Sequence, residues 1–111
     1  MKQDPTMPAE HHSRTHVISE FEKLKSEWES ACEFVSSVHD MSMHEGYQRI
    51  IGLGPDVIPV LLEELRTSPN FWFWAIRALT GENPVKDAHL GNLKLMADDW
   101  VEWGKSKGFI R

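Results

Sequence analysis

Apolar side chains recur at alternating spacings of four and three residues along the first third of the chain. This heptad pattern predicts one long amphipathic helix from about residue 16 to 39, with a single apolar face. Its members are Val17, Phe21, Leu24, Trp28, Ala31, Val35 and Val38. About three heptads are short for an isolated coiled coil, so we expect this face to pack onto the rest of the chain, with dimerisation as the alternative. Residues 1–14 lack the period and predict a mobile polar tail, followed by a single helical domain over residues 15–111.

Helix-start and helix-stop signals divide the middle of the chain. Ser42 with Glu45 three residues later matches a capping box and predicts a second helix that ends at Gly52 and Gly54. Asp56 is the expected N-cap of a third helix. A proline falls in the first turn of this helix, where its missing N–H breaks no helical hydrogen bond. The expected apolar face of this third helix consists of Val57, Ile58, Leu61, Leu62 and Leu65.

Two further helices complete the prediction. Ser68 as cap and Pro69 as first helical residue predict a fourth helix over residues 71–80, closed by Gly81. Residues 82–91 predict a loop, and Asn92 is the expected cap of a fifth helix. That helix carries Leu93, Met96, Trp100 and Trp103 on one face and ends at Gly104 or Gly108. No segment alternates with period two for long enough to predict a strand, so the expected fold is all-α with about five helices.

Composition limits the function classes. The chain has 111 residues and a net charge of −5, with no basic stripe, which disfavours a general nucleic-acid binder and is compatible with an acidic protein that covers a basic partner. The longest apolar run, residues 57–62, is far too short to cross a membrane, and the N-terminus has no secretory apolar region. A single cysteine, Cys32, cannot form an internal disulfide and fits a cytoplasmic location.

The segment from Leu53 to Leu65, followed by Ala75-Ile76-Arg77-Ala78-Leu79, resembles one HEAT-type repeat over about residues 52–81. The resemblance implies a helical hairpin packed with the long N-terminal helix and the C-terminal helix, and a scaffold that binds other proteins. The sequence departs from the HEAT pattern at residues 71–74, where the second helix usually begins with polar residues. Residues 47–52, 78–84 and 100–104 are also similar to a group of small bacterial proteins of unknown activity, which implies a bacterial or mobile-element source.

The aromatic run Phe71-Trp72-Phe73-Trp74 is the main candidate functional feature. Four consecutive residues of a helix point about 100° apart, so these rings together would face nearly every direction. Either helices one and five cover both sides of this helix, or at least one large ring is exposed and marks an interface. The second interpretation predicts a surface for another protein or for self-association. Its expected residues are Phe71, Trp72, Trp74, Arg77 and Trp103.

Metal binding and catalysis form the alternative class of function. His11, His12 and His16 in the expected tail, and the turn from His39 to His44, carry imidazole and thioether groups that metals bind. A solvated tail and an ordinary helix-to-helix turn are the preferred explanations of these residues. Cys32 and His39 lie about 10 Å apart along a continuous helix, too far for a catalytic pair, and no phosphate-binding loop is present. We expect no catalytic residue, no metal site and no cofactor.

A third hypothesis is a nucleic-acid adaptor that uses Lys105, Lys107 and Arg111 with the tryptophans. The same cations suit the negative end of a terminal helix. The sequence therefore favours a non-catalytic protein-interaction module, either an adaptor or an antitoxin-like or immunity-like neutraliser of a basic partner.

Overall fold

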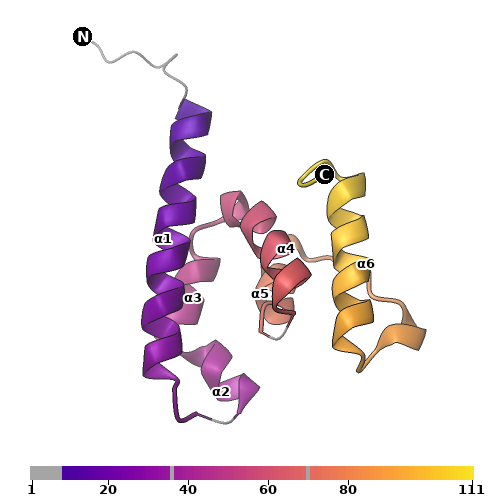
Figure 1. Ribbon diagram of the computed structural model, residues 1–111, viewed down its shortest axis with the longest axis horizontal. Helices are drawn as coiled ribbons and strands as arrows, with labels where there is room; N and C mark the ends of the chain where they lie inside the picture. Colours follow the sequence, from indigo (N-terminus) through magenta and orange to yellow (C-terminus); the bar gives the residue numbers. More distant parts are fainter. Residues whose placement is uncertain (1–8, 36, 70) are drawn as a thin grey trace.

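The computed structural model describes residues 9–35, 37–69 and 71–111, with side chains described from residue 15 onward (Figure 1). Six α-helices, two short 3-10 helices and no strand occur in these residues, which confirms the all-α prediction of about five helices. The elements are α1 (Ala9–Ala31), α2 (Val38–Met43), α3 (Glu45–Ile51), η1 (Pro55–Val57), α4 (Ile58–Thr67), α5 (Phe73–Thr80), η2 (Asp87–His89) and α6 (Leu93–Ser106).

The helices are arranged with α1 and α6 on opposite sides of a central group formed by α3, α4 and α5 (Figure 1). Helix α1 packs along α3, α5 contacts both α3 and α4, and α4 packs against α6. The expected packing of the N-terminal helix onto the rest of the chain is thus observed. One continuous apolar core joins all of these helices, and its largest fully buried side chains are Trp28, Trp72, Trp100, Tyr47 and Phe21.

Helix α1 follows the predicted heptad face only in part. Its face is buried from Val17 to Trp28, but the helix ends at Ala31 and the prediction of a helix to residue 39 is wrong. Ser37 accepts a hydrogen bond from the backbone of Asp40 at 3.2 Å and caps a separate helix, α2. The heptad spacing of apolar residues carries no information about this polar cap, which starts a new helix inside the predicted one. The helix also begins earlier than expected, at residue 9, so residues 9–14 of the expected tail are helical and residues 1–8 lie outside the described residues.

The contact between α1 and α3 depends on a glycine. A Cβ atom at Gly46 would lie only 2.9 Å from the Cβ of Trp28, so the missing side chain lets the two helices approach closely. The predicted Ser42–Glu45 capping box is wrong. Ser42 is buried and donates to the His39 carbonyl, while the Nδ1 of His44 accepts from Gly46 and caps α3.

The starts of α4 and α5 also differ from prediction. Asp56 lies within η1 and forms no side-chain cap, although Pro59 does fall in the first turn of α4. Ser68 ends α4 instead of starting the next helix, because α5 begins only at Phe73. Gly81 closes α5 in the left-handed conformation, with φ of 70°, as predicted.

Helix α6 begins at its predicted N-cap and ends before one of the two glycines predicted to stop it. Asn92 accepts a hydrogen bond from the backbone of Leu95 at 3.1 Å. The helix passes through Gly104 and ends before Gly108, whose φ is 82°. The predicted loop over 82–91 contains the single turn η2.

Candidate protein-binding surfaces

Most rings of the expected aromatic surface are buried or half-buried. Because α5 begins at Phe73, only two of the four rings belong to the helix, and Trp72 precedes it with 1% of its surface exposed. The Trp72 ring stacks on Tyr47 with centroids 5.4 Å apart, and it also contacts Trp28. Trp72 therefore lies inside this chain and not on a surface that a partner reaches, which corrects its expected place in the binding surface.

The other expected binding residues have different surroundings. Phe71 is half-buried against Trp28, with ring centroids 5.5 Å apart. Trp103 is half-buried in a second ring cluster, between Trp100 and Phe109. Trp74 is 50% exposed, and Arg77 is exposed on the same helix. Trp74 and Arg77 are thus the most accessible residues of the predicted surface.

A groove lies between α1, α4 and the C-terminal segment. It encloses about 490 Å³ and is named here the α1–α4 groove. In Figure 1 the C-terminal segment turns back from α6 toward α4, with α1 on the other side of α4. The groove is lined by Ile18, Glu22, Asp56, Pro59, Val60, Glu63, Glu64, Arg66, Phe109, Ile110 and Arg111.

A helix-stop motif builds one wall of this groove. Gly108, in the left-handed conformation, donates to Lys105 at 3.1 Å, and Phe109 donates to Gly104 at 2.9 Å. These two bonds define a Schellman motif, in which the chain reverses over the last helical turn. The reversal stacks Phe109 on Trp103, with ring centroids 5.5 Å apart.

Close packing then fixes the segment that follows. A Cβ atom at Gly104 would lie 2.5 Å from Leu62 Cδ1 and 3.3 Å from Ile110 Cγ1, so a larger residue would require the buried Leu62 side chain to move. Arg66 of α4 donates a hydrogen bond to the carbonyl of Arg111. The C-terminal wall is therefore held to α4 by both apolar and polar contacts.

Charged groups surround the apolar part of the groove. Glu64 forms an ion pair with Lys25 of α1 at 3.0 Å, and Glu63 lies 3.5 Å from Arg66. Burial by itself would lower the pKa of Lys25, but its hydrogen bond to Glu64 and the charges of Glu64, Glu29 and Glu22 raise it. Lys25 therefore stays protonated and ties α1 to α4.

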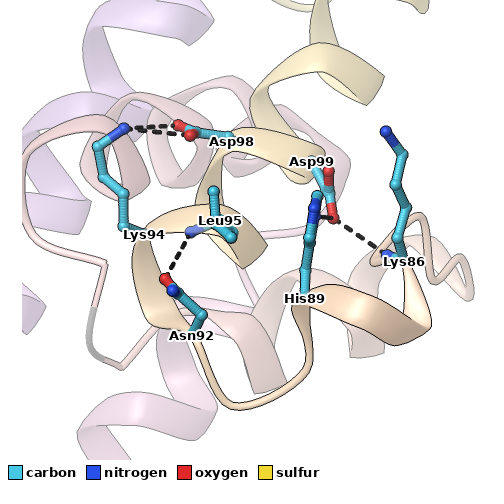
Figure 2. A network of polar contacts seen from close by, with 7 residues as sticks. All are labelled: Lys86, His89, Asn92, Lys94, Leu95, Asp98 and Asp99. Carbon is cyan, nitrogen blue, oxygen red and sulfur yellow. Dashed lines mark hydrogen bonds and ion pairs between the residues drawn. The ribbon is translucent and has the colours of Figure 1, made fainter.

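A separate polar network fastens η2 to α6 (Figure 2). One carboxylate oxygen of Asp99 lies 2.7 Å from Nδ1 of His89 and accepts from the backbone N–H of Lys86 at 3.0 Å. The hydrogen bond from Lys86 is the main reason that the pKa of Asp99 is lowered, and His89 adds to the effect. The two side chains thus hold the loop before α6 in place.

The histidines of the alternative hypotheses are not gathered in the described part of the chain. His16 and His39 are exposed, His44 caps α3, and the side chains of His11 and His12 lie outside the described residues. No group of three or more histidine, cysteine or acidic side chains suited to hold a metal occurs among the residues with described side chains.

The cations of the nucleic-acid hypothesis lie at the end of α6 and beyond it. Lys105 is 3.9 Å from Glu102, Lys107 is the C-cap of α6, and Arg111 lies at the groove. Within the described residues, no helix combines the length and hydrophobicity that a membrane span requires.

Comparison with known proteins finds no match to this chain. No protein-family model, no curated protein and no solved structure matches this chain.

Sequence reasoning missed the α1–α4 groove because its walls are far apart in the chain. Residue 18 does not belong to the apolar face that the heptad pattern predicts, and residues 109–111 follow the last predicted helix. One local signal was available: Gly108 followed by Phe109 has the pattern of a Schellman motif, which places the residue after the glycine back on its own helix.

Proposed function

We propose that this chain is a non-catalytic protein-interaction module, an adaptor or an antitoxin-like or immunity-like neutraliser, whose binding surface is the α1–α4 groove. The observation that carries the proposal is a groove of about 490 Å³ with exposed apolar side chains in it. Ile18 is 44% exposed and Phe109 is 37% exposed on facing walls. Apolar grooves of this kind accept the side chains of a partner's helix or extended segment.

The acidic character of the chain supports the same role. With a net charge of −5, the chain attracts basic proteins over a distance, which accelerates encounter more than it tightens binding. The resemblance of residues 52–81 to a HEAT unit agrees with an interaction role. Trp74 and Arg77 on α5 form the alternative contact surface.

Two matched substitutions test the proposal. Ile18 and Leu93 have the same exposed fraction, 44%, but only Ile18 lines the groove. A photo-crosslinking amino acid at position 18, introduced in the cell that encodes the chain, identifies the partner, which is then purified. Binding of this partner to Ile18→Glu and Leu93→Glu is measured by calorimetry.

We expect Ile18→Glu to weaken binding by roughly tenfold or more, because it places a charge on the apolar contact. Leu93→Glu is expected to bind like the original chain, and both variants are expected to keep their melting temperature. Equal affinities for the two variants would contradict the groove as the binding surface.

A further inference from the structure

The unpaired carboxylates of the α1–α4 groove specify what kind of segment binds there, and this inference rests on the proposed function. Four carboxylates line the groove, and Glu63 and Glu64 are already paired with Arg66 and Lys25. Glu22 and Asp56 have no ion-pair partner among the described residues, and both side chains are exposed. The groove therefore has two carboxylates available for an incoming cation.

These two carboxylates line the groove from two neighbouring elements. Glu22 is on α1, Asp56 is in η1, and α1 packs directly against η1. Arg66 follows Asp56 by ten residues, about 15 Å along a helix, and donates to the carbonyl of Arg111. The groove lining thus carries both signs of charge, and Glu22 and Asp56 are its carboxylates without an ion pair in the described part of the chain.

The apolar contacts lie between and beside these charged groups. Ile18 is one helical turn before Glu22 on α1, and Val60 is one turn after Asp56. Phe109 of the C-terminal segment lines the same groove. A ligand that satisfies both features carries a cation and a bulky apolar side chain about one helical turn apart.

We infer that the α1–α4 groove binds a basic amphipathic segment of a partner protein, with a lysine or arginine at Glu22 and Asp56 and a bulky apolar side chain against Ile18, Val60 and Phe109. Hot-spot contacts combine a desolvated apolar anchor with a positioned cation in this way. The two carboxylates select for a basic segment, and the apolar side chains of the groove contribute most of the binding affinity.

The test uses two synthetic peptides that share one amphipathic helical design with a leucine stripe. Their polar positions are lysine in the first peptide and glutamate in the second. Binding to the full chain is followed by amide chemical-shift changes at residues 18, 60 and 110. The variants are Glu22→Gln/Asp56→Asn in the groove and Glu82→Gln/Asp87→Asn, an exposed pair outside it with the same change of charge.

We expect the lysine peptide to shift the groove amides and the groove variant to bind it roughly tenfold more weakly than the control variant. High salt should reduce this difference, because the contacts are exposed ion pairs. Equal binding of the glutamate peptide, equal affinities of the two variants, or no shift of the groove amides overturns the inference. The proposed function is judged separately, since Ile18→Glu and Leu93→Glu are compared on the natural partner.

Discussion

The Tyr47 hydroxyl replaces a helix cap that the residues before α5 do not provide. Trp72 is the N-cap of α5 and forms no side-chain capping bond. The hydroxyl of Tyr47, from α3, accepts from the N–H of Ala75 at 3.0 Å and donates to the carbonyl of Phe71 at 2.5 Å. Burial raises the pKa of this phenol well above its usual range, so it stays neutral and keeps its donor proton.

Replacement of Tyr47 by phenylalanine tests this cap. Tyr47→Phe keeps the ring that stacks on Trp72 but leaves a buried N–H and a carbonyl without their partner. We expect a loss of about 1–3 kcal/mol in the free energy of unfolding, measured by urea denaturation. Thr80→Val is the control. It removes a hydroxyl that donates to Ile76 of its own helix and accepts from the exposed N–H of Glu82, and it should cost less because water can replace the partner of Glu82. An unchanged urea midpoint for Tyr47→Phe would show that the hydroxyl does not cap α5.

The two tryptophans of the aromatic run should differ sharply in their contribution to stability. Trp72 is in the core, whereas Trp74 is 50% exposed. We expect Trp72→Ala to lower the free energy of unfolding by about 3–5 kcal/mol and Trp74→Ala by less than about 1 kcal/mol. Thermal and urea unfolding of the two variants measure this difference, and similar losses for both would contradict the assigned positions.

Among the helix ends, those set by local chemistry could be predicted from the sequence. The Asn92 cap and the Gly81 stop involve only neighbouring residues, and both are observed. The start of α5 depends on Tyr47, which is 28 residues away from Ala75, so no local signal marks it. After the end of α1, the next buried side chain is Cys32, and Ser37 then caps α2. The spacing of the apolar residues alone does not determine where α1 ends.

The attachment of η2 to α6 predicts a dependence of stability on pH. The pKa of Asp99 is lowered from its ordinary value of 3.8, so the folded state favours the ionised form more than the unfolded state does. This stabilisation is complete above the ordinary pKa and is lost as the pH falls through the lowered pKa. Asp99→Asn should therefore destabilise the chain most near neutral pH, and its difference from the original chain should shrink below about pH 4.

Urea unfolding of Asp99→Asn at a series of pH values measures this dependence. The neighbouring Asp98 is the matched control, since it pairs only with exposed Lys94 at 3.1 Å (Figure 2). Asp98→Asn is expected to cost no more than about 0.5 kcal/mol. A destabilisation by Asp99→Asn that is the same at acidic and neutral pH would contradict the role of the ionised carboxylate.

For the molecule as a whole, the sequence predicted the all-α fold class but neither the burial of Trp72 nor the α1–α4 groove. The number of helices follows from periodicity and caps, whereas the position of Trp72 follows from the packing of α1 and α3 around it. The α1–α4 groove joins Ile18 to Phe109 across nearly the whole length of the chain. Such long sequence separations are not encoded in any local pattern, so the sequence did not predict the groove and did not show that Trp72 lies in the core.

The most direct measurement compares Ile18→Glu with Trp74→Ala in calorimetric binding to the same purified partner protein. Both side chains are about half exposed, so neither change should unfold the chain. We expect Ile18→Glu to lose roughly tenfold or more in affinity and Trp74→Ala to stay within about twofold of the original chain. Loss of binding by Trp74→Ala, with Ile18→Glu unaffected, would place the interaction on α5 and contradict the groove.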